Sequence, residues 1–212
     1  MRMSVGKTLV AATLCLALAA CGGTAGGRSA PSGSSGQGDA PAAAQAVPAL
    51  AAATTAAPYC GITWGTAEKT AGSLSTAPLL TVETGRHECW DRVVFEFNGT
   101  ARGYSVRYSA QVPTDGEGVD LVPYTAGGAH LWVTLMAPAY DANNGSTIDA
   151  RDGDRVANVL RYDTLRDVVY GGSFEGYTNF AVGVRARLPF RVMLLAGPGT
   201  HSRIVVDIAH RW

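Results

Sequence analysis

The sequence is poor in charged residues and carries no net charge, which bears first on its partners. Charged residues make up 16% of the 212 residues, and 17 Lys and Arg balance 17 Asp and Glu. The basic residues are almost all Arg, and they form no basic stripe along the chain. Proteins that bind nucleic acid normally concentrate positive charge in such a stripe or patch. We therefore expect no nucleic-acid partner.

The sequence also lacks a hydrophobic run of membrane-spanning length near its start. An apolar stretch from Leu9 to Ala20 follows the basic Arg2 and Lys7. A spanning helix needs about 20 apolar residues, so this stretch is typical of a signal peptide over residues 1–20. The small residues before Cys21 resemble the lipobox of bacterial lipoproteins; an ordinary secretory signal with a chance cysteine is the alternative. We predict lipid attachment at Cys21, which anchors the chain on the extracytoplasmic face of the cell membrane.

Residues 21–58 lack aromatic side chains and contain almost no charge. Nearly all of this segment is Gly, Ala, Ser, Thr, Pro and Gln. Such a composition cannot bury enough apolar surface to offset its ordering entropy, which predicts a disordered tether. Every Trp and Phe lies in residues 59–212, so this part is the predicted folded domain. A length of about 150 residues is ordinary for one domain with a single core.

Cysteine is scarce, and the positions of the four residues assign them separate roles. Cys15 lies inside the predicted signal peptide, and Cys21 is the predicted lipid site. Cys60 and Cys89 remain, and in an exported protein two such cysteines in one small domain predict a disulfide. The alternative, a redox-active pair, lacks the Cys-x-x-Cys spacing. The bond is expected to contribute about 3–4 kcal/mol and to join the start of the domain to its first convincing strand.

Alternation of apolar and polar residues predicts an all-β domain. Val93, Phe95 and Phe97 fall on one side of a strand, opposite Arg92 and Glu96. Turn signals such as Asn-Gly, Asp-Gly and Pro-Gly separate the predicted strands. These strands cover residues 79–84, 90–98, 104–110, 130–136, 166–170, 179–185, 190–195 and 203–210, with a short helical turn near 157–162. The fold class predicted is an antiparallel β-sandwich, with a barrel-like arrangement as the alternative.

Motifs of known catalytic chemistry are lacking as well. The sequence contains no Gly-x-Ser-x-Gly elbow and no phosphate-cradling glycine loop. His87, His130, His201 and His210 are scattered without the spacing of metal ligands, so they are expected to be structural histidines at the surface. We therefore predict no catalytic residue, no metal and no cofactor.

A polar loop from Asp141 to Asp154 is rich in Asp and Asn, whose oxygen atoms calcium prefers. The spacing misses the EF-hand pattern, because Gly145 stands where a ligand is required and no Glu follows at the closing position. We interpret the segment as a solvated polar loop.

Aromatic side chains near polar residues are the other candidate feature, since exposed rings often bind glycans. Trp132 lies on the polar side of its predicted strand, and Tyr140 lies beside the polar loop. Both are candidate ligand-binding residues. Packing in a second layer of the sandwich is the alternative for each of them.

Ten short segments, in this order and spacing, carry a resemblance to a known family. They are Cys60-Gly61, Trp64-Gly65, Thr84 to Cys89, Asp91 to Phe95, Gly103 to Val106, Leu131 to Val133, Ala137 to Ala139, Phe174 to Gly176, Phe190 to Val192 and Arg203 to Ile208. Together they resemble the AMIN-like domain lipoproteins of actinobacteria. The resemblance covers nearly all of residues 60–212.

The resemblance implies a function in the cell envelope. The AMIN domain of cell-wall amidases is a small β-sandwich that targets its host protein to peptidoglycan. Arg203 and Asp207 match its Arg-x-x-x-Asp strand signature, and residues four apart on a strand share a face. Ligand contact and a structural role at a sheet edge are both open for this pair. Because no amidase domain accompanies this one, wall targeting is expected and wall hydrolysis is not.

Three functions are compatible with these observations. The first is a non-catalytic envelope module that binds peptidoglycan or another envelope glycan. The second is a scaffold that docks onto an envelope protein, and the third is a carrier of a small apolar ligand. The sequence gives no positive reason to expect an enzyme.

Overall fold

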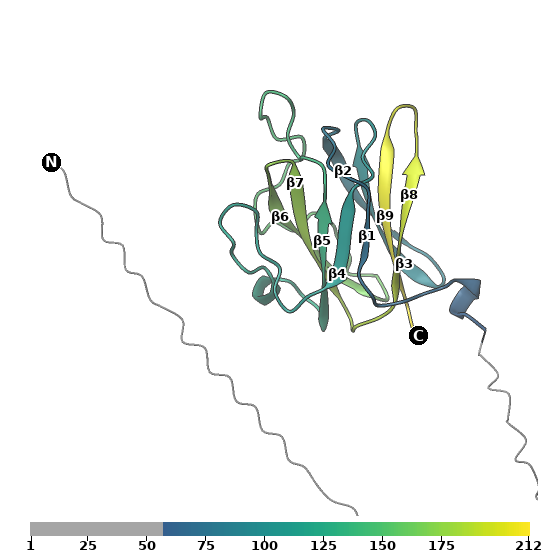
Figure 1. The fold of residues 1–212 in the computed structure, drawn as a ribbon. Coiled ribbons are helices and arrows are strands. Elements are labelled where there is room, and N and C mark those ends of the chain that lie inside the picture. Colours follow the sequence, from purple (N-terminus) through teal and green to yellow (C-terminus); the bar gives the residue numbers. More distant parts are fainter. Residues whose placement is uncertain (1–56) are drawn as a thin grey trace, which may run out of the picture. The chain divides into compact units, whose positions relative to one another are not determined.

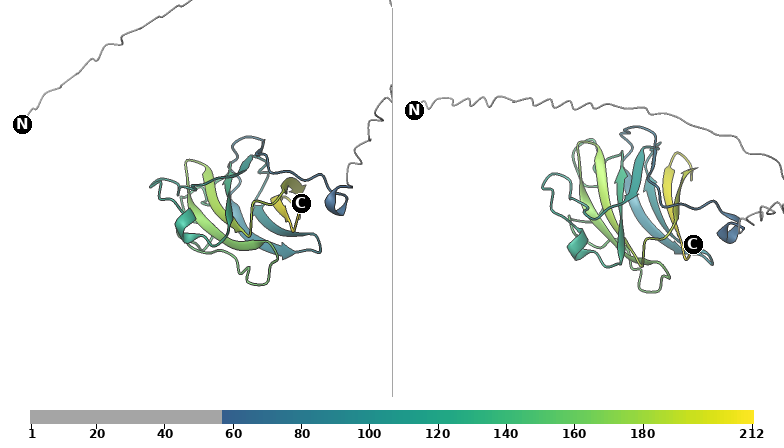
Figure 2. Two further views of the ribbon diagram at one scale, coloured as in Figure 1. Left: turned by 90° about the horizontal axis from the view of Figure 1, so that it is seen from below. Right: turned by 60° about the horizontal axis from the view of Figure 1, so that its bottom comes forward.

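The computed structural model describes residues 57–212, which form two antiparallel β-sheets (Figure 1). The strand order is β1-β4-β5-β7-β6 in the five-stranded sheet and β2-β3-β9-β8 in the four-stranded sheet. Figure 2 shows the same strands from two further directions. The predicted antiparallel β-sandwich is confirmed, and the barrel-like alternative is wrong, because these strands form two separate sheets. The predicted signal peptide, Cys21 and nearly all of the predicted tether lie outside the described residues.

The strands match the predicted ones with small shifts of their ends. They are β1 (Lys69–Ala71), β2 (Leu79–Arg86), β3 (Trp90–Phe97), β4 (Tyr104–Tyr108), β5 (Ala129–Leu135), β6 (Leu165–Phe174), β7 (Tyr177–Val184), β8 (Phe190–Ala196) and β9 (Ser202–Ala209), with short 3-10 helices η1 (Tyr59–Gly61) and η2 (Val122–Tyr124). The sequence did not predict β1 or the two 3-10 helices. The helical turn predicted near residues 157–162 is wrong: the segment is an irregular turn that exposes 90% of Leu160.

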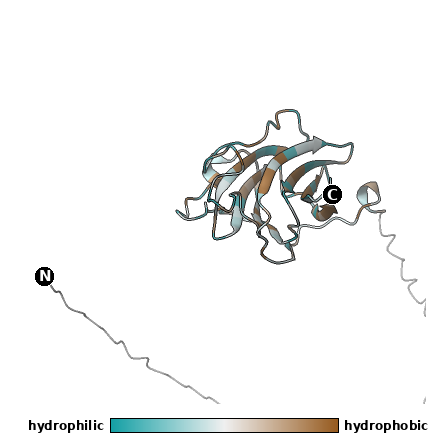
Figure 3. Cartoon of the chain, turned by 90° about the horizontal axis from the view of Figure 1, so that it is seen from above, coloured by the Kyte–Doolittle hydropathy of each residue, from teal (hydrophilic) through white to brown (hydrophobic). Residues whose placement is uncertain are grey.

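The main core lies between the two sheets and follows the predicted alternation. Val93, Phe95 and Phe97 on β3 are fully buried. The ring of Phe95 lies 4.9 Å from that of Phe180 on the opposite sheet, centroid to centroid. Burial of one such side chain stabilises the fold by about 1.5–3 kcal/mol. Figure 3 shows hydrophobic stretches (brown) along the strands. Because large side chains fill this interior, it lends no support to a carrier of an apolar ligand.

A second, smaller core lies on the outer side of the five-stranded sheet. Val112 and Leu121, from the segment between β4 and β5, pack against Val169 of β6 and Ala181 of β7. As a result β7 is buried on both faces along almost its whole length. This covering segment also shapes the pocket described below.

A disulfide joins Cys60 to Cys89, as predicted. Cys60 belongs to η1, and Cys89 directly precedes β3, so the bond fixes the start of the described chain to the four-stranded sheet. Both sheets, the core and this disulfide lie within residues 57–212. We therefore expect this part to fold by itself. Within this part, no helix has the length and apolar character needed to cross a membrane.

Candidate functional site

An open pocket of about 690 Å³ lies between the segment that precedes β5 and the segment that precedes β6. Glu117, Asp152 and Asp154 contribute carboxylates to its lining, and Tyr124 and Arg155 lie with them. We call these five residues the acidic pocket. The ring of Tyr124 is 65% exposed, which leaves it free to contact a ligand.

A tight turn positions the first side of the acidic pocket. Thr114 Oγ1 accepts the backbone N–H of Val119 at 3.0 Å and closes the turn that carries Glu117. Gly116, with φ of 85°, supplies the left-handed backbone that this turn needs. The N–H of Asp115 donates to the carbonyl of Gly171 at 2.6 Å. The turn is therefore attached to β6.

The second side of the pocket is held against the same strand. Gly153 N–H donates to the carbonyl of Tyr170 at 2.8 Å, and Tyr170 N–H donates to that of Asp154 at 2.9 Å. The pairing of β6 with β7 is irregular between Tyr170 and Ser173. Within this bulge, a Cβ on Gly172 would lie 3.0 Å from both carboxylate oxygens of Asp152. A larger residue would crowd this carboxylate, and the φ of 96° at Gly172 favours glycine.

The environment at and behind the acidic pocket disfavours the charged form of two aspartates. Burial, together with the nearby Asp152 carboxylate, raises the pKa of Asp115 to about 6, although a hydrogen bond from Asn179 opposes the shift. Burial and the Glu117 carboxylate also raise the pKa of Asp152. Burial and these two aspartates raise the pKa of Tyr170 to about 12. Perturbed acids that gather at one pocket are typical of functional sites.

One oxygen of Asp115 has no hydrogen-bond partner. Its Oδ1 accepts the Asn179 amide at 2.7 Å, whereas Oδ2 is buried and unpaired within the described part of the chain. Leaving a buried acceptor unpaired costs about 1–3 kcal/mol. The fold thus tolerates an unfavourable group behind the pocket, which is expected of a site kept for a ligand rather than for stability.

We expect Asp115→Asn to stabilise the domain above pH 6. Because the folded-state pKa of Asp115 lies above its ordinary value, ionisation destabilises the fold, and stability falls as the pH rises through about 6. The substitution removes this loss, worth about 1 kcal/mol after allowance for partial exposure. Urea unfolding at pH 4.5 and pH 7.5 measures it, and the gain is expected to be larger at pH 7.5. An equal effect at the two pH values would contradict this interpretation.

Trp132, a predicted ligand-binding residue, reaches this region indirectly. It lies half-buried on the outer side of the five-stranded sheet. The guanidinium carbon of Arg107 lies 4.0 Å from the centroid of the Trp132 ring. Its indole N–H donates to Asn179 Oδ1 at 2.8 Å, and Asn179 in turn binds Asp115. Trp132 also packs against the second core. Its position therefore matches the second-layer alternative, and it orients Asn179 behind the acidic pocket.

Tyr140, the other predicted aromatic residue, lines a different pocket of about 620 Å³. Its hydroxyl accepts the N–H of Gly176 at 2.9 Å, which leaves the half-buried ring beside Tyr170 and Phe174. The two predicted aromatic residues therefore do not share one site. Tyr140 stays a candidate ligand contact.

Arg203 and Asp207 share the outer face of the four-stranded sheet, away from both pockets. Asp207 is fully buried between Arg92 and Arg191, and its Oδ1 accepts from Arg92 Nε at 2.6 Å. Arg203 pairs in register with Glu96, and its Nε is buried without a partner among the described residues. A sheet-edge position is wrong, because β9 lies between β3 and β8. The buried ion pairs favour a structural role for Asp207.

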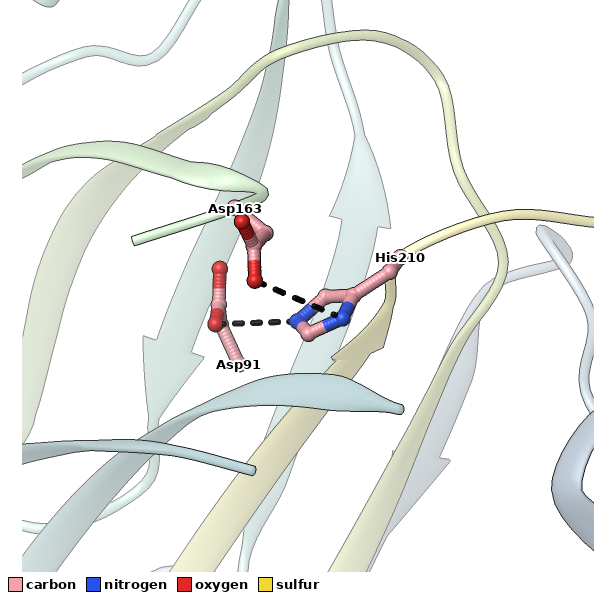
Figure 4. A group of neighbouring side chains, drawn as sticks. All are labelled: Asp91, Asp163 and His210. Atoms are coloured by element: carbon pink, nitrogen blue, oxygen red, sulfur yellow. Dashed lines mark hydrogen bonds and ion pairs between the residues drawn. The ribbon is translucent and has the colours of Figure 1, made fainter. Parts of the chain in front are cut away.

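All four histidines are partly exposed, although the side chain of His210 keeps only 12% of its surface exposed. Figure 4 shows the His210 ring facing the carboxylates of Asp91 and Asp163, with a dashed line to each. Donor atoms of the three residues lie within 4.8 Å of one another, a spacing that suits a metal ion and that the sequence did not suggest.

The hydrogen bonds of Asp91 show that this cluster links the two sheets. His210 Nε2 lies 3.0 Å from Asp91 Oδ1. The other oxygen of Asp91 accepts the backbone N–H groups of Thr164 and Leu165, at 2.5 and 3.0 Å, where β6 begins. Asp91 belongs to β3, so its carboxylate joins the four-stranded sheet to the five-stranded one.

The polar loop does not gather its acids around one point. Asp141 Oδ1 accepts the N–H groups of Asn143 and Gly145, at 2.8 and 2.9 Å. Asp154 Oδ2 accepts the N–H of Arg151 at 2.8 Å. These bonds stabilise turns, as a solvated loop would. Asp152 and Asp154, at the end of the loop, belong to the acidic pocket instead.

Comparison with known proteins gives one family. None of the curated proteins compared with the chain matches it. The family model of the AMIN-like domain matches residues 77–210, which is most of the sandwich from before β2 to the end of β9. The match agrees with the resemblance carried by the sequence motifs. The chain therefore belongs to the AMIN-like domain family.

Proposed function

We propose that this protein is a lipid-anchored, non-catalytic module of the cell envelope whose acidic pocket binds peptidoglycan. AMIN-like domains are generally non-catalytic binding modules, and the family indicates an envelope or peptidoglycan-related binding function. The observation that carries the ligand class is the group of three carboxylates, from Glu117, Asp152 and Asp154, that lines one pocket together with the exposed Tyr124.

The chemistry of the acidic pocket fits the stem peptides of peptidoglycan. These short peptides carry ammonium and carboxylate groups and are attached to a hydroxyl-rich glycan. Glu117 and Asp152 offer acceptors for an ammonium group or for sugar hydroxyls, and Tyr124 offers a flat ring. The Arg155 side chain is 62% exposed, although its Nε pairs with Asp167 at 2.9 Å. Its Nη2 donates to the carbonyl of Tyr124 at 2.9 Å, which leaves Nη1 for a ligand carboxylate.

Attachment through Cys21 is the second part of the proposal. The signal-peptide pattern and the cysteine after small residues support it. Acyl chains on Cys21, followed by a flexible tether, would keep the pocket within reach of the wall next to the membrane. In cells given labelled palmitate, we expect label on the wild-type chain and none on Cys21→Ala. Equal labelling of the two proteins would refute lipidation at this residue.

We expect Glu117→Gln combined with Asp152→Asn to weaken binding to purified sacculi about tenfold, because two charged acceptors are lost. Co-sedimentation of residues 57–212 with sacculi measures this. Wild-type binding should also be weaker at pH 5 than at pH 7.5, since Asp115, with a pKa of about 6, and Asp152, with a raised pKa, are protonated as the pH falls.

The matched control is Glu83→Gln combined with Glu88→Gln, which makes the same change of charge on exposed residues outside the pocket. This control should bind as the wild type does. If the wild-type domain stays in the supernatant, the proposed function is wrong. If the pocket variant and the control lose binding equally, only the assignment to the acidic pocket fails.

A protein-binding role is the second candidate, and a specific surface favours it. Leu74, Phe174 and Tyr177 are 54%, 56% and 40% exposed. They lie together, because a Cβ placed on Gly176, at the turn between β6 and β7, would be 3.3 Å from the Leu74 side chain. Exposed apolar clusters often mark protein interfaces. Crosslinking in cells, followed by mass spectrometry, would then recover one reproducible envelope protein that Phe174→Ser abolishes.

A further inference from the structure

We propose a second binding site, for an anionic glycan strand, in a pocket of about 580 Å³ at the disulfide-bonded start of the domain. Tyr59, Trp64, Arg211 and Trp212 provide the aromatic and charged part of its lining, and we call these four residues the annex pocket. This inference rests on the proposed function in the envelope. It concerns a different site and a different part of the wall polymer.

Most of the annex pocket is built by segments outside the family match, and Pro189 completes its lining from within the matched range. All four residues lie before residue 77 or after residue 210. The disulfide fixes η1 to the matched domain, and the indole N–H of Trp64 donates to the carbonyl of Tyr59 at 2.8 Å. Figures 1 and 2 show the end marked C on the same side of the domain as η1. The segments on both sides of the matched range therefore meet in one preformed pocket.

The charge of the annex pocket is opposite to that of the acidic pocket. The guanidinium of Arg211 lies 4.7 Å from the centroid of the Tyr59 ring. Arg191 lies 5.4 Å from the ring of Trp64 and 5.1 Å from that of Trp90, but its guanidinium is paired with Asp207 at 2.8 Å, so Arg211 supplies the cation of the pocket lining. None of the described residues that line the pocket has an acidic side chain. An anion is therefore the favoured partner.

The shape of the annex pocket and its indole rings restrict the class of ligand further. Trp212 is 72% exposed and Trp64 is half-buried, so indole faces are available at the pocket. A sugar ring offers C–H groups to such a face, while its hydroxyl or carboxylate substituents bind guanidinium. The volume lies in the range of pockets that hold small ligands. A flat lipid surface would require protruding side chains, whereas these residues line a hollow. The chemistry points to a glycan whose sugars carry carboxylates.

The experiment uses residues 57–212 and peptide-free glycan strands, whose muramic acid residues keep their lactyl carboxylates. Calorimetric titration and tryptophan fluorescence follow binding. We expect saturable binding by the wild type. Arg211→Ala combined with Trp212→Ala should weaken it about tenfold, with an unchanged melting temperature. Neutral chitohexaose should bind at least about tenfold more weakly than the anionic strands.

The matched control is Arg187→Ala, because Arg187 stacks on Tyr108 at 4.8 Å, as Arg211 does on Tyr59, but lies outside the annex pocket. This variant, and the Glu117→Gln/Asp152→Asn variant, should bind glycan strands as the wild type does. Trp212→Ala alone tests the pocket if the double variant folds poorly. The proposal is overturned if the wild type shows no saturable binding, if the annex variants bind normally, or if chitohexaose binds equally well. Retention on intact sacculi would still support the proposed function in each of these cases.

Discussion

Asp207→Ala is expected to lower the free energy of unfolding by about 3–5 kcal/mol, although the residue lies on the outer face of a sheet. Its carboxylate is fully buried between two guanidinium groups. Arg92 Nε and Nη2 donate to it at 2.6 and 2.9 Å, and Arg191 Nη2 lies 2.8 Å away. Without the carboxylate, the two positive charges on β3 and β8, the strands on either side of β9, repel each other and lose their acceptor.

Urea unfolding of residues 57–212 measures this loss. Asp163→Ala is the matched control, because Asp163 pairs with Arg86 at 3.0 Å while the two side chains are 47% and 56% exposed. An exposed pair of this kind contributes about 1 kcal/mol or less. Arg92→Ala should cost less than Asp207→Ala, since Arg191 still neutralises the aspartate. Similar losses for Asp207→Ala and Asp163→Ala would show that the buried ion pairs do not stabilise the sheet.

Asp91→Ala is expected to cost about 3–4 kcal/mol and to loosen the start of β6. The fully buried carboxylate is the acceptor for two backbone N–H groups of that segment and for the His210 side chain. Each buried donor that loses its partner costs about 1–3 kcal/mol. The two sheets also lose a direct polar link between β3 and β6.

Hydrogen exchange locates this effect better than global stability does. In Asp91→Ala, the amides of Thr164 and Leu165 should exchange faster relative to those of β7. His210→Ala serves as the comparison, because it removes the bond to Oδ1 and leaves both backbone donors paired with Oδ2. It should therefore leave these two amides protected. If the amides of Thr164 and Leu165 stay equally protected in Asp91→Ala, the Asp91 carboxylate does not hold the two sheets together.

Local pattern was sufficient for eight of the nine strands and for the disulfide, but it did not predict β1. Val93, Phe95 and Phe97 repeat every second residue because side chains on a strand point to alternate faces. The structure buries all three. The pattern was less informative for β7, which is buried on both faces because Val112 and Leu121 cover its outer side. A segment distant in sequence decides such burial, and no periodicity within the strand reveals it.

The candidate site shows the same division. Asp-Gly turn signals at Asp115 and Asp152 were visible in the sequence, but nothing in their spacing indicated that the Asp152 carboxylate raises the pKa of Asp115. They meet because both segments bind to β6, at the carbonyl of Gly171 and at the backbone of Tyr170. His210 likewise reaches Asp91 because β9 lies beside β3.

By itself, the sequence determined the sandwich, the partners of the disulfide and the family, since these depend on alternation, on the count of cysteines and on the order of short motifs. Only the tertiary structure decided which polar residues form sites. It buried Asp207 between two arginines and left Asp115 with an unpaired oxygen. The physical reason is that charge and hydrogen bonding depend on distances in space, which strand pairing and loop packing set between residues far apart in the chain.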